Sequence, residues 1–180
     1  MNAGQDRAGN EQVARLRREL DRAFAEPARR AQAGTETLLA IRIAGQGFAL
    51  RLSALAGLFA DRRIIPLPGT APELLGIAGL RGGLVAVYDL RALLGFPRGE
   101  SPRWLALVRS GSLTGLAFEE LDGSLQVDPH DVSPATGPAH RGLAREVARA
   151  GGVLRPVLDV ASIVETIMRP ARHGVRPEER

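Results

Sequence analysis

Hydrophobic and polar residues alternate with a period of two from residue 37 onward, which predicts β-strands. The first alternating run is interrupted at Gly45-Gln46-Gly47 and then resumes, as expected for a β-hairpin with a glycine-containing turn. Its apolar positions are Leu39, Ile41, Ile43, Phe48, Leu50 and Leu52. A second hairpin is predicted from Leu105 to Phe118, with its turn at Ser110-Gly111-Ser112.

A longer pattern occurs twice. The stretch from Gly82 to Leu94 resembles the stretch from Gly151 to Val164, because in each a Gly-Gly pair is followed by an apolar strand, an Asp and a short helix. The two Asp residues, Asp89 and Asp159, lie 70 residues apart, and each copy follows one of the predicted hairpins. This spacing is too long for solenoid repeats and suits two similar small barrels.

The two ends of the chain differ in composition from the part between them. Residues 1–36 are rich in charge and alanine, and their apolar residues at helical spacing predict one amphipathic helix. These residues are Val13, Leu16, Leu20 and Phe24. The helix is either a docking or coiled-coil element, or an extension that packs loosely and stays partly disordered. Residues 169–180 are expected to be a disordered tail, which leaves 37–168 as the folded domain.

Composition excludes several classes of protein. The absence of cysteine rules out disulfides, thiolate metal sites and cysteine nucleophiles, and it suits a reducing cytosol. No apolar run approaches the roughly 20 residues of a membrane span, and the polar start has no signal-peptide core. We therefore expect a cytoplasmic protein that is not inserted into the membrane.

The charge pattern gives little support to nucleic-acid binding. All 24 basic residues are Arg, and 20 acids are interleaved with them, which gives a net charge of +4 without a concentrated basic stripe. Aromatic residues make up 4% of the chain, and Trp104 and Tyr88 are its single Trp and Tyr, so a base-stacking platform is hard to assemble. A small β-barrel that binds nucleic acid is nevertheless the alternative function.

No residue pattern indicates catalysis or a bound metal or cofactor. His130 stands between Asp128 and Asp131, which reads as a turn because no further ligands accompany it at metal-site spacing. His140 and His173 have no evident orienting partner for general base catalysis. The chain contains neither a nucleophile-elbow serine nor a lysine for a phosphate-binding loop. We therefore predict a binding protein and assign no catalytic, metal or cofactor-binding residue.

Three ordered stretches resemble the CheW family of chemotaxis coupling proteins. They are FALRLSALAGLF, residues 48–59, IIPLPGTAPELLGIAGLRGGLVAVYDLRALLG, residues 64–95, and LALVRSGSLTGLAFEELDGSLQVDPHDVSP, residues 105–134. Family members carry a Pro-rich strand, a hydrophobic turn of the form G-x-x-N-L-R-G, and the element V-x-D-L-R. The resemblance extends over roughly residues 38 to 165.

The resemblance implies a fold, a function and partners. The fold would be all-β, with two intertwined five-stranded SH3-like barrels and short helices, to which the N-terminal helical extension is an addition. The protein would be a non-enzymatic adaptor that couples chemoreceptors to a CheA-type histidine kinase. One lobe would bind the regulatory domain of the kinase, and a groove between the lobes would bind the cytoplasmic tip of a methyl-accepting receptor, which would bring the protein to membrane-associated receptor arrays.

The resemblance also assigns roles to individual residues. The kinase-binding turn would consist of Gly79, Leu80, Arg81 and Gly82, with Arg81 as the exposed contact. Leu52, Leu55 and Leu58 match the segment that lines the receptor groove, with ordinary core packing as an equal alternative.

Asp89 and Arg91 match the D-L-R element, and we expect structural roles for both. Asp89 would cap the helix that follows it, and Asp159 would do the same in the second copy.

The sequence departs from the family in three places. Gly79 replaces the usual Asn, Gly57 stands where Glu is often found, and residues 138–152 are expected to form a longer, Arg-rich loop. These departures suit a divergent adaptor in an alternative chemosensory pathway.

Overall fold

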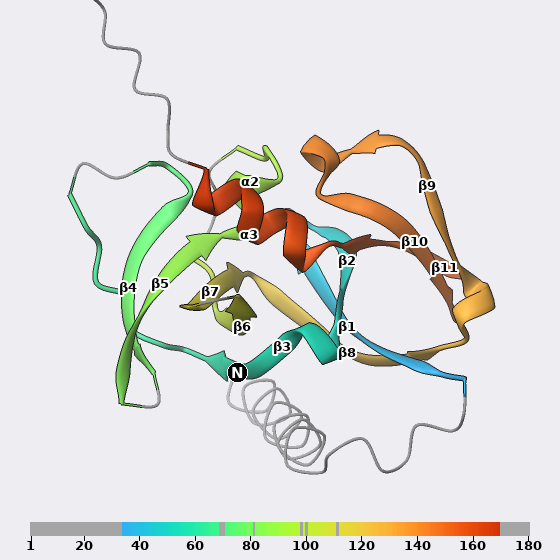
Figure 1. The fold of residues 1–180 in the computed structure, drawn as a ribbon, viewed down its shortest axis with the longest axis horizontal. Coiled ribbons are helices and arrows are strands. Elements are labelled where there is room, and N and C mark those ends of the chain that lie inside the picture. Colours follow the sequence, from blue (N-terminus) through green and yellow to red (C-terminus); the bar gives the residue numbers. More distant parts are fainter. Residues whose placement is uncertain are drawn as a thin grey trace, which may run out of the picture.

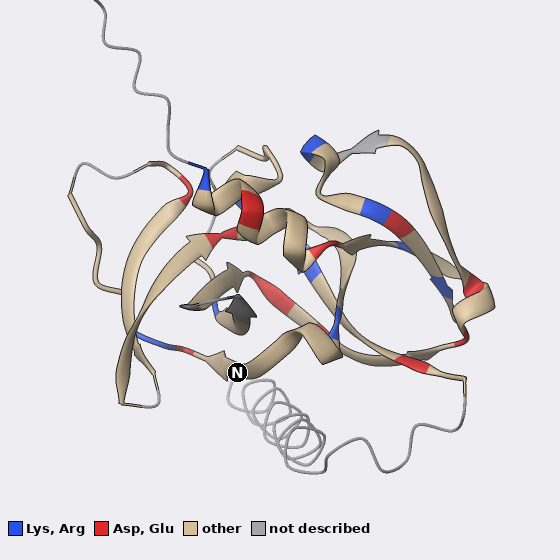
Figure 2. Ribbon diagram, viewed as in Figure 1, with Lys and Arg blue, Asp and Glu red and all other residues tan. Residues whose placement is uncertain are grey.

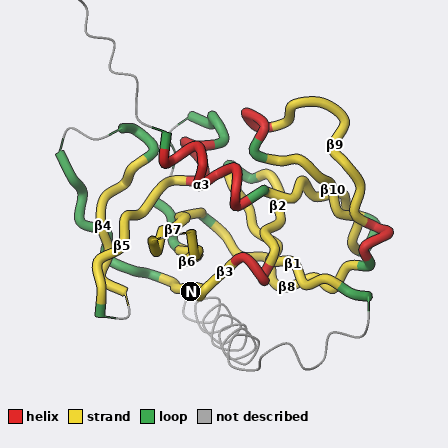
Figure 3. The backbone as a smooth tube through the Cα atoms, viewed as in Figure 1, coloured by secondary structure: helices red, strands yellow, loops and turns green. Residues whose placement is uncertain are grey.

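The computed structural model describes residues 34–68, 71–80, 82–97, 99, 101–110 and 112–169. Most of the predicted N-terminal extension, most of the C-terminal tail, and Arg81 lie outside these described residues. Strands dominate the described part (Figure 3). They are β1 (Glu36–Ile43), β2 (Gln46–Arg51), β3 (Leu55–Ala60), β4 (Leu74–Leu80), β5 (Gly83–Asp89), β6 (Trp104–Ser110), β7 (Ser112–Phe118), β8 (Glu120–Val127), β9 (Val132–Ala139), β10 (Ala144–Ala150) and β11 (Val153–Leu158).

Two short α-helices and three 3₁₀ turns complete the described elements. The helices are α2 (Leu90–Leu93), which follows β5, and α3 (Val160–Met168), which follows β11. The 3₁₀ turns are η1 (Leu52–Ala54), η2 (Pro129–Asp131) and η3 (His140–Gly142). Both hairpins that the alternation predicted are present, as β1–β2 and β6–β7, and both Gly-Gly stretches form a strand followed by a helix.

The strands form two sheets, which we call lobe A and lobe B. Lobe A has the strand order β8-β1-β2-β11-β10-β9, and lobe B has the order β3-β6-β7-β5-β4. In Figure 1, lobe B lies on the left and lobe A on the right, with α3 crossing above the region where they meet. The all-β prediction is confirmed, although one sheet has six strands where five were expected.

The two halves of the chain exchange their hairpins. The β1–β2 hairpin of the first half pairs in parallel with β11 of the second half, at Ala49 with Val157. The β6–β7 hairpin of the second half pairs in parallel with β5 of the first half, at Thr114 with Ala86. Each sheet is therefore completed by strands from the other half, which is the intertwined arrangement that the family resemblance implied.

One expectation about the second half is wrong. Residues 138–152 were expected to be a long loop, but β10 occupies residues 144–150 and pairs with both β9 and β11. The arginines and acids of this strand interrupt its alternation of apolar and polar residues, which hides the strand in the sequence.

Three apolar clusters hold the fold together. The largest, which we call the shared core, contains residues of both sheets and both helices, including Ile41, Phe48 and Leu116 at 0% exposure. A second cluster, with Val87 and Leu107 at its centre, fills lobe B, and a third and smaller one fills lobe A. Since buried apolar area is the main source of stability, the shared core ties the two lobes into one unit.

Ion pairs lie on both sides of the small apolar cluster of lobe A. Arg51 contacts Glu36 at 2.6 Å and Glu146 at 2.7 Å. On the other side, Asp122 contacts Arg155 at 2.8 Å and Arg42 at 3.0 Å. A more exposed pair beside lobe B joins Arg103 to Asp61 at 3.2 Å, so each lobe combines an apolar cluster with ion pairs nearer the surface.

We expect replacement of Gly76 by Ala to destabilise the protein strongly. Gly76 in β4 has a φ of 143°, and a Cβ there would overlap the carbonyl oxygen of Ile65, which accepts a hydrogen bond from the Ile77 N–H. The clash and the disfavoured φ should lower the free energy of unfolding by about 2 kcal/mol or more, measured by urea denaturation. Gly79→Ala is the matched control, because nothing lies within 4 Å of a Cβ at Gly79, and equal losses in the two variants would contradict this account.

Candidate protein interaction surfaces

The tip of the β4–β5 hairpin exposes apolar surface. Leu84 is 75% exposed and pairs across the hairpin with Gly79, which has no side chain to cover it. Leu80 is 3% exposed and points into lobe B, and Gly82 forms the turn with a φ of 79°. We call Gly79, Gly82, Gly83 and Leu84 the hairpin-tip surface. Figure 2 shows that β4 and β5 carry no charge along their length until Asp89 at the end of β5.

Sequence analysis placed the candidate kinase-binding turn at this tip but missed Leu84. The alternation contained a usable signal, because Val85 and Val87 are buried in lobe B and Leu84 therefore faces the opposite side of the strand. Large exposed apolar side chains next to an uncovered backbone are typical of interaction sites.

The three receptor-groove candidates all pack within the chain. Leu55 is 8% exposed and belongs to the shared core, and the partly buried Leu52 and Leu58 pack against it. Their contacts in the described structure are therefore those of core packing, with the outer edges of Leu52 and Leu58 still exposed.

Arg91 and Glu119 connect the two lobes. Arg91 in α2 donates to Glu119 Oε1 at 2.5 Å and to the Pro97 carbonyl at 2.6 Å, while Glu119 Oε2 accepts the Ala44 N–H at 2.5 Å. Ala44 lies in the β1–β2 turn of lobe A, so a single carboxylate joins that turn to the helix that follows β5. Sequence analysis gave Arg91 a structural role but missed Glu119, because an acid within the run Glu-Glu-Leu-Asp carries no distinctive signal.

Asp89 and Asp159 occupy equivalent positions at the starts of α2 and α3. Asp89 accepts the Arg91 N–H at 2.9 Å, and Asp159 accepts the Ala161 N–H at 3.1 Å. Burial raises the pKa of Asp89, and nearby Glu119 adds to this effect. Burial by itself would also raise the pKa of Asp159, but hydrogen bonds from Ser162 and Ala161 outweigh it and lower this pKa. Both side chains act as N-caps, which satisfy backbone donors at the helix starts.

His140 in η3 packs against two aromatic rings. Its ring centroid lies 4.7 Å from that of Phe48 and 5.7 Å from that of Phe96. Burial lowers the pKa of His140, because the charged imidazolium is poorly solvated among these rings. Next to it, Arg141 donates to the Ala92 carbonyl at the end of α2 at 3.4 Å.

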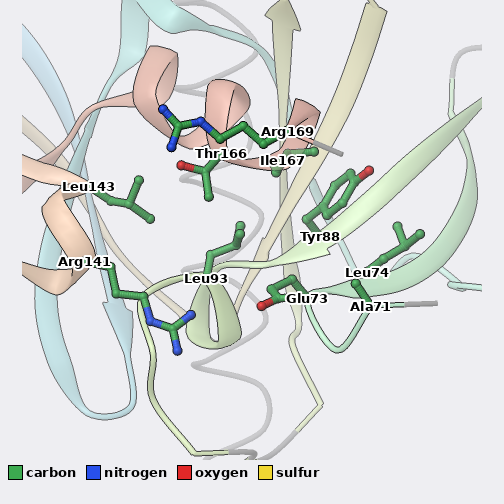
Figure 4. Close-up of a pocket in the computed structure, with 10 residues that line it drawn as sticks. All are labelled: Ala71, Glu73, Leu74, Tyr88, Leu93, Arg141, Leu143, Thr166, Ile167 and Arg169. Carbon is green, nitrogen blue, oxygen red and sulfur yellow. The ribbon is translucent and has the colours of Figure 1, made fainter. Parts of the chain in front are cut away.

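Two adjoining hollows lie at the opposite end of lobe B from the hairpin tip. The first has a volume of about 370 Å³ and lies between α2, α3, η3 and the strands β4 and β5 (Figure 4). It is lined by Ala71, Glu73, Leu74, Tyr88, Leu93, Arg141, Leu143, Thr166, Ile167 and Arg169. The second has a volume of about 330 Å³ and shares Ala71 and Leu74 with the first.

The described residues contain no group of three or more His, Asp or Glu side chains arranged to hold a metal ion. Among these residues no helix is long and apolar enough to span a membrane. His130, the histidine between two acids, lies in η2, where Asp128 accepts the His130 N–H at 2.9 Å, so this segment is a capped turn.

Fold and surfaces together define a two-lobed β protein whose halves exchange hairpins and whose apolar hairpin tip is exposed. The CheW-like domain family model matches residues 37–168, so the chain belongs to the CheW-like domain family. A chemotaxis protein CheW from Rhizobium meliloti (strain 1021) is 25% identical over 144 residues, covering 77% of this chain and 93% of the relative. The crystal structure of the scaffolding protein TtCheW from Thermoanaerobacter tengcongensis superposes with a TM-score of 0.66 at 17% identity, covering 72% of this chain and 92% of that one.

We expect Glu119→Gln to lower the free energy of unfolding by about 2 kcal/mol, because it leaves the mostly buried Arg91 guanidinium without its counter-charge. Arg91→Met should lower the free energy of unfolding by a similar amount. The double variant should lose clearly less free energy of unfolding than the sum of the two single losses, since neither charge is then left unpaired. Urea denaturation of the four proteins measures this coupling, and strictly additive losses would show that the pair does not connect the lobes.

We expect stability to depend on pH through His140. Its pKa is lower in the folded state than the unfolded value of about 6.5, so the unfolded chain binds more protons, and stability is lost as pH falls from about 7.5 through this value. His140→Asn, which tolerates the positive φ of 52°, should flatten this part of the profile. Thermal unfolding between pH 7.5 and 5.5 tests the idea, with His130→Asn in η2 as the control. If the melting temperature of His140→Asn still falls with pH as it does in the wild type, the pH dependence of stability comes from another group.

Proposed function

We propose that this protein is a non-enzymatic chemosensory adaptor that couples chemoreceptors to a CheA-type histidine kinase. The observation that carries the proposal is the match of the CheW-like domain to residues 37–168, which spans both lobes and the shared core. The relative from Rhizobium meliloti is named a chemotaxis protein, and the solved relative is described as a scaffolding protein, which support a role in binding and assembly. In this role the protein contributes surfaces and no chemistry.

The hairpin-tip surface, together with Leu80 and Arg81, is the proposed contact for the regulatory domain of the kinase. The tip combines a large exposed apolar side chain, Leu84, with two strands that carry no charge before Asp89. An apolar anchor beside an Arg suits a binding hot spot, since such residues contribute most of the energy of protein interfaces. Because Leu80 is buried in lobe B, its part is to fix the turn from below.

The exposed edges of Leu52 and Leu58 are the proposed contact for the helical tip of a receptor. Leu55 lies beneath them in the shared core and would hold them in place. An apolar stripe of this kind fits a helix docked along a groove. Gly57 in β3 supplies no side chain, so this contact would be more apolar than in relatives that carry Glu there.

We further propose that the protein works in the cytoplasm, at receptor arrays, without membrane insertion and without nucleic acid as a partner. Weak contacts to kinase and receptor suffice there, because many linked contacts raise the effective concentration of each binding site. The Gly residues at positions 79 and 57 suit a divergent or alternative chemosensory pathway.

A titration of purified protein with the regulatory domain of the kinase tests the adaptor role. We expect saturable binding that Leu84→Asp and Arg81→Glu each weaken at least tenfold, or about 1.4 kcal/mol. Met168→Asp is the matched control, because Met168 is 66% exposed at the end of α3, away from the hairpin tip (Figure 1). Circular dichroism checks that each variant is folded. Failure of the wild type to bind would contradict kinase coupling, and binding unaffected by either variant would move the contact elsewhere.

A further inference from the structure

The first hollow has an apolar floor built by both halves of the chain (Figure 4). Leu74 and Leu93 come from β4 and α2, and Leu143 and Ile167 come from the segment after η3 and from α3. Leu93 and Leu143 are 4% and 3% exposed, so the base of the hollow is part of the rigid interior. Its volume of about 370 Å³ is within the range of ligand sites and would hold one large apolar side chain with room to spare.

The second hollow adjoins the first. Ala71 and Leu74 line both, and the far end is bordered by Pro66, Leu67 and Pro102. We call the two together the helix-side groove. The first hollow takes one large side chain, and an extended peptide can place that side chain there while its neighbouring residues run over the rim toward the second hollow.

Two arginines on the rim of the first hollow, Arg141 in η3 and Arg169 after α3, favour an acidic occupant. Arg141 makes a long hydrogen bond of 3.4 Å to the Ala92 carbonyl, and Arg169 makes an equally loose contact of 3.3 Å with Glu165. The side chains of Arg169 and Glu165 are 76% and 68% exposed, and an ion pair so exposed to solvent contributes little. Both guanidinium groups therefore have donors available for a carboxylate, which a planar guanidinium binds well. Among the described residues, Glu73 is the acid of the first hollow and Asp89 is the acid of the second, so the acidic residue of an occupant is expected beside the arginines and not over the second hollow.

We propose that the helix-side groove binds a short extended segment of a partner protein in which a large apolar residue stands next to Asp or Glu. The apolar side chain rests on Leu93 and Ile167, and the neighbouring carboxylate faces Arg169 at the α3 rim of the hollow. The proposal goes beyond the adaptor function above, because α2 and α3, which line the groove, lie at the other end of lobe B from the tip of the β4–β5 hairpin (Figure 1). The protein can then hold a further partner while the hairpin tip is in use.

Selection of peptides on the full-length protein tests the proposal. Random dodecapeptides displayed on phage are selected against the wild type, and the best binder is synthesised with a fluorescent label and titrated by fluorescence anisotropy. We expect the selected peptides to share a large apolar residue adjacent to an acid. A synthetic peptide that separates these two residues should bind at least tenfold more weakly.

Variants locate the binding site. Thr166 is exposed on α3 and lines the hollow, so Thr166→Trp fills it without removing a buried contact, and Arg169→Glu reverses the charge at its rim. Each should weaken peptide binding at least tenfold. The matched controls are Ala161→Trp, on the same helix but outside both hollows, and Arg149→Glu, on the exposed face of β10. Both controls, and Leu84→Asp at the hairpin tip, should leave peptide binding unchanged.

Three results would overturn the proposal. The first is that selection yields no peptide with the paired apolar and acidic residues. The second is that Thr166→Trp and Arg169→Glu, checked for folding by circular dichroism, bind the peptide as well as the wild type does. The third is that phenylacetate, which offers a ring and a carboxylate without a peptide backbone, binds as tightly as the selected peptide, since the occupant would then be a small anionic molecule.

Discussion

The exchange of hairpins between the two halves of the chain is the constraint on which the rest of the structure depends. Lobe A would lose β1 and β2 without the first half, and lobe B would lose β6 and β7 without the second. The shared core lies where these exchanged strands meet, and both helices pack against it. Because the lobes cannot separate without opening both sheets, the surfaces that the described strands and helices form keep fixed positions relative to one another. The Arg91–Glu119 pair adds a polar contact to the same junction.

Sequence patterns predicted the elements well and their pairing partners poorly. Alternation located both hairpins because it reports which residues share a buried face of a strand. The Gly-Gly repeat located both strand–helix units, because the same order of turn, apolar strand, capping Asp and short helix occurs in each copy. Neither pattern says which strand lies alongside which, since the pairing of β2 with β11 joins residues more than a hundred positions apart. The intertwined topology came from the family resemblance, and β10 was missed because its charges disturb the alternation.

Some residues of the candidate sites could be found from the sequence, and others could be found only from the structure. The family motif led to the hairpin tip but not to Leu84, because alternation places Leu84 opposite Val85 and Val87 without saying which face of the strand is buried, and the structure shows that Leu84 is the exposed one. Leu52, Leu55 and Leu58 show the converse, since apolar residues at groove spacing proved to pack on the shared core. Glu119 and the helix-side groove depend on contacts between distant segments, which no local pattern records. The N-terminal amphipathic pattern and Arg81 fall outside the described residues, and their roles remain predictions.

The ion pairs at the rim of lobe A make that rim sensitive to the salt content of the surrounding solution. Partly exposed charge pairs weaken as salt screens them, whereas the buried apolar clusters are little affected by moderate salt. A rise in ionic strength therefore loosens the edge of this sheet while the shared core still holds the two lobes together. The molecule can thus give way at its periphery without losing the connection through its interior.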